Sequence, residues 1–113
     1  MSDCVFCRIV SGEIPARIVH SDDEAIAFAD LSPKAPTHLL VIPRRHLPSL
    51  AASGPEDAPL LGHLVAVANQ LATGAGLRDG YRLVVNTGPA AGQSVEHLHV
   101  HLLGGRSFDW PPG

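Results

Sequence analysis

An α+β fold, with about five antiparallel strands, one long helix and one short helix, is predicted by three features of the sequence. The chain has 113 residues, of which 45% are hydrophobic, enough for one domain with its own core but too few for two full layers of parallel α/β structure. Residues 59–72 carry apolar side chains at helical spacing, whereas five other segments are short apolar runs. Most of the 11 glycines and 10 prolines lie between these segments, where they favour short connections.

The first half of the chain is expected to contain one short helix and three strands. These elements are predicted at residues 5–11, 16–21, 25–30 and 38–43. Gly12 and Pro15 end the helix, and the acidic turn at residues 22–24 joins the first two strands into a hairpin. Pro33 and Pro36 impose an extended connection into the third strand, because proline restricts both its own φ and the residue before it.

The second half is expected to contain the long helix and two further strands. These elements are predicted at residues 59–72, 81–86 and 97–103. Gly74 and Gly76 end the long helix, and a glycine- and alanine-rich loop at residues 87–93 joins the last two strands. The simplest arrangement is a meander, in which each strand lies beside the next and the long helix covers one face.

The composition excludes several kinds of partner. The formal net charge of -3 and the isoelectric point near 6.1 offer no basic surface for general nucleic-acid binding. The sequence does not begin with a basic segment followed by an apolar one, and no apolar stretch has membrane-spanning length. We therefore expect a single cytoplasmic domain, residues 1–113, with neither nucleic acid nor membrane among its partners.

Three histidines, His97, His99 and His101, alternate with aliphatic residues near the C-terminal end. In a strand they would share one face, while Leu98 and Val100 would enter a core on the other. Neighbouring histidines would then lie about 6.6 Å apart and the outer two about 13 Å apart, too far for one metal ion to bind all three. The spacing favours a division of roles among the three rings. An exposed, metal-scavenging strand is the alternative.

The loop at residues 86–94, before the histidines, is rich in small residues that let backbone N–H groups approach phosphate oxygens. The chain has no Walker-type phosphate loop and no carboxylate cluster suited to Mg²⁺ beside a triphosphate. An imidazole can instead attack phosphorus directly and form a covalent intermediate. Such a nucleophile needs one free nitrogen and an acceptor, either a backbone carbonyl or another histidine, for the proton on the other.

The histidine row and its surroundings resemble the signature of the histidine-triad (HIT) superfamily of nucleotide hydrolases and transferases. The resemblance runs from Phe6 to Gly113 and is greatest to the Hint branch, the purine nucleoside phosphoramidases. The matching segments are Ala35-Pro36-Thr37-His38, Val41-Ile42-Pro43, Gly62-His63-Leu64, Gly80-Tyr81-Arg82, Val84-Val85-Asn86, Gly92-Gln93-Ser94-Val95, Leu103-Gly104-Gly105-Arg106 and Trp110-Pro111-Pro112-Gly113. Glu96 departs from the pattern, because an aromatic residue is common there in close relatives of the Hint branch.

The resemblance implies a catalytic role for four side chains. His99 is the expected nucleophile, which forms a nucleotidyl-histidine intermediate with the α-phosphate of an AMP or GMP phosphoramidate. His38 would support the imidazole of His99, and His101 would hold phosphate oxygens. Ser94 would assist the departing amine, and no catalytic metal is expected.

The remaining nucleotide contacts are implied in the same way. Asn86 and the backbone around Gln93 and Ser94 would help hold the phosphate, and Asp30 would accept hydrogen bonds from the ribose hydroxyls. An apolar slot would hold the purine. Its residues would be Val5, Phe6, Ile9, Phe28, Leu31 and Leu40.

Cys4 and Cys7 form a Cys-x-x-Cys pair, which supplies two of the four ligands that structural zinc takes. The resemblance extends to bacterial Hint-like proteins and to galactose phosphate uridylyltransferases, and implies that His46 and His97 complete a Zn²⁺ site. That ion would be structural and would hold the N-terminal segment near the sheet. Two free thiols, or a redox pair, are the alternatives.

The resemblance also implies a homodimer, with the long helix and residues 81–86 at the interface and residues 110–113 reaching toward the partner's site. The leading function is hydrolysis of the P–N bond of purine nucleoside 5'-phosphoramidates. The alternatives are hydrolysis of dinucleoside polyphosphates, nucleotidyl transfer, or a regulatory or scaffold role that depends on nucleotide binding alone.

Overall fold

The computed structural model describes residues 3–113 and has the expected α+β composition, with five antiparallel strands, one short helix and one long helix. In chain order the elements are α1 (Val5–Val10), β1 (Ile18–Ser21), β2 (Ala25–Ala29), β3 (Thr37–Pro43), α2 (Ala58–Gly74), β4 (Tyr81–Val84) and β5 (Val100–Gly104). Three 3-10 turns lie in the connections, at Leu50–Ala52, Pro55–Asp57 and Pro89–Ala91. Among the described residues, no helix is both long and apolar enough to cross a membrane.

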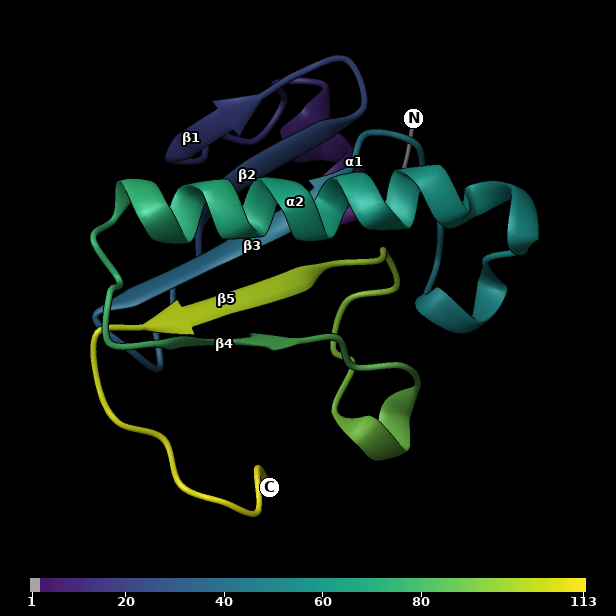
Figure 1. The fold of residues 1–113 in the computed structure, drawn as a ribbon. Helices are drawn as coiled ribbons and strands as arrows, with labels where there is room; N and C mark the ends of the chain where they lie inside the picture. The colour runs from purple at the N-terminus through teal and green to yellow at the C-terminus, as the bar shows by residue number, and fades with distance from the viewer. Residues whose placement is uncertain (1–2) are drawn as a thin grey trace.

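The strand order is β1-β2-β3-β5-β4, so the predicted meander is wrong at its last two strands (Figure 1). After β3 the chain crosses the sheet through α2, enters the far edge as β4, and returns to fill the gap as β5. Burial explains the placement. Val100, Leu102 and Gly104 of β5 are buried, which suits a central strand, whereas no residue of the four-residue strand β4 is fully buried, which suits an edge.

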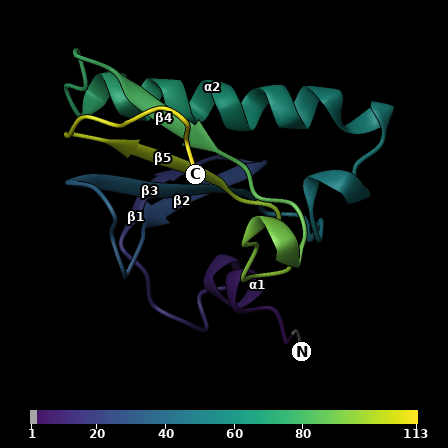
Figure 2. The same cartoon turned by 90° about the horizontal axis from the view of Figure 1, so that it is seen from below.

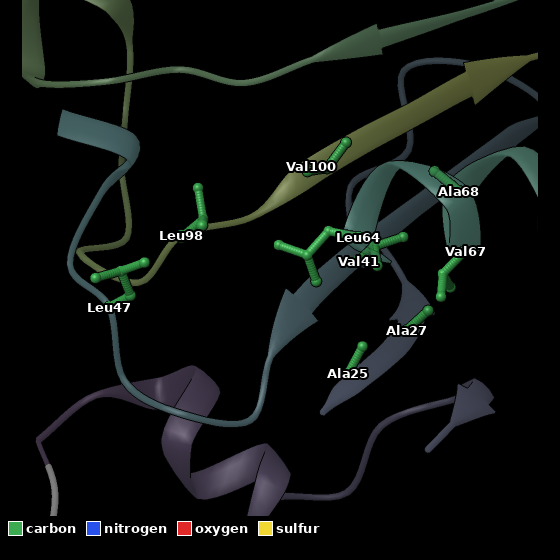
Figure 3. Packing of buried hydrophobic residues seen from close by; sticks show 9 residues of the cluster. All are labelled: Ala25, Ala27, Val41, Leu47, Leu64, Val67, Ala68, Leu98 and Val100. Carbon is green, nitrogen blue, oxygen red and sulfur yellow. The ribbon is translucent and has the colours of Figure 1, made fainter. Parts of the chain in front are cut away.

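The sheet separates two apolar clusters. Helix α2 covers one face and α1 lies on the other (Figure 2). Beneath α2, Leu64, Val67 and Ala68 meet Leu98 and Val100 of the histidine row (Figure 3). The opposite cluster consists of Phe6, Ile26, Phe28, Leu40 and Ile42. The apolar stripe predicted for the long helix therefore packs as expected, except that Val65 is 48% exposed.

The histidine row is only partly a strand, because β5 begins at Val100 and not at the predicted residue 97. The backbone N–H of Leu98 donates to the carbonyl of Leu47 at 2.7 Å, outside the sheet ladder. The predicted alternation persists nonetheless. Leu98 and Val100 face α2, whereas the rings of His97 and His99 pack edge-on against Phe6 of α1. The row thus lies at the end of a strand, against the short helix.

Candidate active site and metal centre

His99 has the geometry expected of a nucleophile. Its Nδ1 lies 2.7 Å from the backbone carbonyl oxygen of His97, and because that oxygen can only accept, Nδ1 carries the proton. In the neutral ring the lone pair then lies on Nε2. The side chain is buried, and the edge-on ring of Phe6 fixes its orientation, with the ring centroids 5.2 Å apart. His99 also lines a cavity, so the ring can meet a ligand there.

His38 contacts His101 rather than His99, contrary to the expectation from the sequence. The backbone N–H of Lys34 donates to Nδ1 of His38 at 3.0 Å, so a neutral His38 carries its proton on Nε2. That nitrogen lies 2.9 Å from Nδ1 of His101 and 3.5 Å from Oδ2 of Asp30. His38 therefore donates to His101, whose own proton must lie on Nε2. The carbonyl of His97 supports the candidate nucleophile in place of His38.

His38 and His101 form a hydrogen-bond relay beside Asp30, and both rings are held in the neutral form. The pKa of His101 is lowered to about 4, mainly by burial and also by the neighbouring rings of His99 and His38, whereas Asp30 acts in the opposite direction. Burial also lowers the pKa of His38, again opposed by Asp30. Near neutral pH the Nε2–H of His101 is consequently a fixed hydrogen-bond donor on an uncharged ring.

A cavity of about 330 Å³ adjoins His99 and His101. Ten of the residues predicted for the site line it: Val5, Phe6, Ile9, Phe28, Asp30, Leu31, Leu40, Ser94, His99 and His101. Sequence reasoning missed five others, which are Ile14, Pro15, Ala16, Ala29 and Val95. For Ile14, Pro15 and Ala16 the signal in the sequence is their apolar run after Gly12, although that pattern by itself predicts only a turn and the start of a strand. Apart from Asp30, Ser94 and the two histidines, the lining is apolar.

Asn86 and Gln93 do not line this cavity. The backbone N–H of Gln93 donates to the carbonyl of Gly88 at 3.1 Å. It is therefore not available to a phosphate, contrary to the expectation from the sequence. Its side chain braces the loop: Oε1 accepts from the N–H of Gly88, and Nε2 donates to the carbonyls of Pro48 and Val95. Gln93 therefore shapes the loop that carries Ser94.

Cys4, Cys7, His46 and His97 converge as predicted, with their ligand atoms all within 4.8 Å of one another. The Nδ1 atom of His97 lies 3.4 Å and 3.5 Å from the two sulfurs and 3.2 Å from Nδ1 of His46. A tetrahedral zinc ion with ordinary Zn–N and Zn–S bonds separates its ligand atoms by about 3.3 to 3.8 Å. The four side chains thus fit a zinc ion.

The orientation of His97 suits the same purpose. Its Nε2 donates to the carbonyl of Pro43 at 2.8 Å, which leaves the lone pair on Nδ1, toward the cysteines. Burial lowers the pKa of His97, so the ring stays neutral, as a metal ligand must be. The backbone N–H of Cys7 donates to Sγ of Cys4 at 3.4 Å, which ties the first turn of α1 to the site.

Asp30, His38 and His101 also bring their side chains within metal-binding distance of one another. Here the protonation pattern opposes a metal ion, because the Lys34 N–H occupies Nδ1 of His38 and leaves the proton on the nitrogen that would have to coordinate. This group is therefore better described as a hydrogen-bond relay.

The chain is similar to known proteins over nearly its whole length. The model of the family described as "Scavenger mRNA decapping enzyme C-term binding" matches residues 3–108. An uncharacterized HIT-like protein of Synechocystis sp. is 52% identical over 111 residues, which cover 98% of this chain and 97% of that protein. A second HIT-like protein, from Synechococcus elongatus, shows the same identity and coverage.

Two solved structures are similar over nearly the whole chain. A HIT family hydrolase from Legionella pneumophila superimposes with a TM-score of 0.96 and 47% identity, covering 98% of this chain and 100% of that one. A histidine triad protein from Clostridium difficile gives a TM-score of 0.92 and 40% identity, with 96% of each chain covered.

Proposed function

The chain belongs to the histidine-triad (HIT) family, and we propose that it is a hydrolase that cleaves the P–N bond of purine nucleoside 5'-phosphoramidates. The observation that carries this proposal is the hydrogen bond from Nδ1 of His99 to the carbonyl of His97, which leaves Nε2 free beside an apolar cavity. Asp30 on the cavity wall is suited to ribose hydroxyls, and the apolar lining is suited to a planar base.

In the proposed reaction, Nε2 of His99 attacks the α-phosphorus. A bond forms between phosphorus and the imidazole, and the bond between phosphorus and the departing amine breaks. The amine leaves with the electron pair and takes up a proton, for which the Ser94 hydroxyl on the cavity wall is the proposed donor. The Nε2–H of His101 donates to a phosphate oxygen. Water then attacks phosphorus and breaks the bond between phosphorus and the imidazole, which releases the nucleoside monophosphate and restores His99. The remaining proton of that water returns to the Ser94 hydroxyl.

The test is turnover of adenosine 5'-phosphoramidate by His99→Ala. Loss of the nucleophile should lower kcat by at least about 1,000-fold, while AMP binding measured by calorimetry stays within a few fold. His63→Gln, a histidine substitution outside the cavity, is the matched control and should retain turnover. Undiminished turnover by His99→Ala would contradict the proposal. Faster cleavage of a diadenosine polyphosphate than of the phosphoramidate would contradict the choice of substrate.

We also propose that Cys4, Cys7, His46 and His97 hold a structural Zn²⁺ ion. The fit of the ligand atoms and the Pro43 carbonyl behind His97 support this choice of metal. Cysteines that bind zinc must stay reduced, which suits a reducing compartment, so the proposed location is the cytoplasm.

A single domain spanning residues 1–113 that forms a homodimer is the proposed assembly. Strand β4 is an edge strand, and the exposed apolar side chains Val65, Tyr81 and Val85 lie on α2 and on or next to β4. Trp110 in the tail is 82% exposed, as expected for a side chain that reaches a partner's site. Light scattering on the purified protein should give twice the chain mass, and a monomer at micromolar concentration would contradict the dimer.

A further inference from the structure

A second cavity lies at the end of the sheet where β4 begins and β5 ends, at the left of Figure 1. Its volume is about 560 Å³, and none of its lining residues lines the cavity beside His99. Three arginines, Arg78, Arg82 and Arg106, are in its walls together with Asp79 and Phe108. One carboxylate against three guanidinium groups leaves the cavity positive, although the whole chain carries a net charge of -3.

Two of the arginines are held against the same aromatic ring. The guanidinium carbon of Arg106 lies 4.2 Å from the centroid of the Phe108 ring, and that of Arg82 lies 5.0 Å from it. Such contacts are favourable for each cation separately. They also keep two like charges close together, and that repulsion decreases when an anion binds beside them.

No carboxylate within residues 3–113 forms an ion pair with Arg78, Arg82 or Arg106. Arg8 and Arg45, in contrast, pair with Glu13 and Asp57.

Backbone carbonyls satisfy only part of the donor capacity in the cavity. Arg82 donates to the carbonyl of Asp109, and Arg106 donates to those of Lys34 and Ser107. A guanidinium group has five N–H donors, so each of these arginines keeps several for a ligand. The carbonyl contacts hold the two side chains in place and fix the start of the tail.

We propose that this cavity binds the phosphate groups of a small anionic ligand. The planar fork of a guanidinium matches the oxygen spacing of a phosphate group, and Phe108 fixes the orientation of two such forks. Gly76 and Gly80, with φ of 73° and 131°, line the same cavity, and a Cβ at either position would meet no atom within 4 Å. The turns therefore leave room for a ligand at the backbone. The site is separate from the proposed hydrolase centre and does not depend on it.

The test is titration of the ¹⁵N-labelled protein with pyrophosphate, followed by NMR. The amide signals of Gly80 and Gly105 and the side-chain Nε–H signals of Arg82 and Arg106 should shift and saturate together. Arg78→Gln should weaken the binding measured at these signals about tenfold, as expected for a lost hydrogen bond to a charged group. Arg78 is an exposed residue whose side chain makes no hydrogen bond within residues 3–113, so the variant should fold. Arg17→Gln, at another exposed arginine, should bind normally.

A parallel titration with ADP distinguishes the source of the phosphate. Equal affinities for ADP and pyrophosphate identify a site for phosphate groups alone, and tighter binding of ADP identifies a nucleotide site of the same chemistry. The proposal is overturned if the signals of Gly80 and Gly105 do not move while those around His101 do. It is also overturned if Arg78→Gln and Arg17→Gln bind pyrophosphate equally well.

Discussion

His97 and His38 are both buried, and each lies beside a second histidine, yet opposite nitrogens of their rings meet opposite kinds of backbone group. The carbonyl of Pro43 accepts a hydrogen bond from Nε2–H of His97, which leaves the lone pair on Nδ1, toward the cysteines. In His38 the backbone N–H of Lys34 donates to Nδ1, so Nε2 carries the proton and donates to His101. A histidine that donates to a backbone carbonyl thus keeps a lone pair for a metal ion, whereas a histidine that accepts from a backbone N–H keeps a proton to donate to another ring.

Residue type alone therefore does not decide the role of a buried histidine. His99, between the two groups, follows the rule of His97, because a carbonyl holds its Nδ1 proton and leaves a free lone pair on Nε2. The ring of His99 lines the cavity, so the same hydrogen bond to a carbonyl gives a candidate nucleophile there instead of a metal ligand.

Removing the metal ligands should give the largest effect. In Cys4→Ser/Cys7→Ser, bound zinc should fall from about one ion per chain to nearly none, and the melting temperature should fall sharply, because binding of structural zinc contributes on the order of 10 kcal/mol to folding. Elemental analysis and thermal unfolding measure the two quantities. His63→Gln should keep its zinc. Substoichiometric zinc in the unmutated protein would sink the assignment.

Removing the hydrogen bond between His38 and His101 should lower turnover without changing the zinc content. In His38→Ala the Nδ1 of His101 loses its donor, so the ring can take either tautomer and its Nε2–H is no longer fixed. We expect kcat to fall about 100-fold, within the range for misplaced acid–base groups, with zinc content unchanged. The matched variant His46→Ala should show the reverse, a loss of zinc with kcat within a few fold. Equal losses of kcat in the two variants would remove the distinction between the groups.

The relay should also make stability depend on pH. The pKa of His101 is lowered to about 4 in the folded protein, from an ordinary value of 6.5. Below pH 6.5 His101 therefore binds a proton in the unfolded chain but not in the folded protein. The free energy of unfolding consequently falls as the pH drops from 6.5 toward 4. The loss due to His101 is at most about 3 kcal/mol.

Urea unfolding of the unmutated protein and of His101→Asn, between pH 7 and pH 4.5, isolates this contribution, because both proteins keep the zinc ligands. The unmutated protein should lose more stability than the variant over this range. Parallel curves for the two proteins would exclude the contribution from His101.

The smallest effect is expected from a third pair of histidines, His20 and His63, which both contact Oδ2 of Asp22, at 2.6 Å and 2.8 Å. Burial alone would raise the pKa of Asp22, but the hydrogen bonds from His20 and from two backbone N–H groups, with that from His63, lower it below its ordinary range. These rings are partly exposed, so His63→Gln should cost less than about 1 kcal/mol of unfolding free energy. A loss above 2 kcal/mol by urea unfolding would assign this group a larger role.

The sequence predicted the elements well because local signals mark them. Proline and glycine punctuate the strands, and the apolar stripe from Leu60 to Ala72 fits α2. The order of β4 and β5 has no such local signal, because it depends on how α2 crosses the sheet. The start of β5 was missed because Leu98 pairs with Leu47, 51 residues away, instead of with a neighbouring strand.

The candidate site was predicted as a set of residues, but not as a set of contacts. Ten of the residues predicted for the active site line one cavity, and the four proposed metal ligands converge. The partner of His38 was wrong because its ring meets His101, 63 residues away, in a geometry that only the register of β3 on β5 fixes. Likewise, no pattern in the sequence shows that Pro43 stands behind His97.

The tautomer of each ring tests the division of roles among the histidines, because these roles depend on which nitrogen carries the proton. Long-range ¹H–¹⁵N NMR spectra of the protein labelled at histidine, recorded near pH 7.5, report this for every ring. The account predicts protonation of His99 at Nδ1, and of His38, His97 and His101 at Nε2. A spectrum with His99 protonated at Nε2, or His38 at Nδ1, would contradict it.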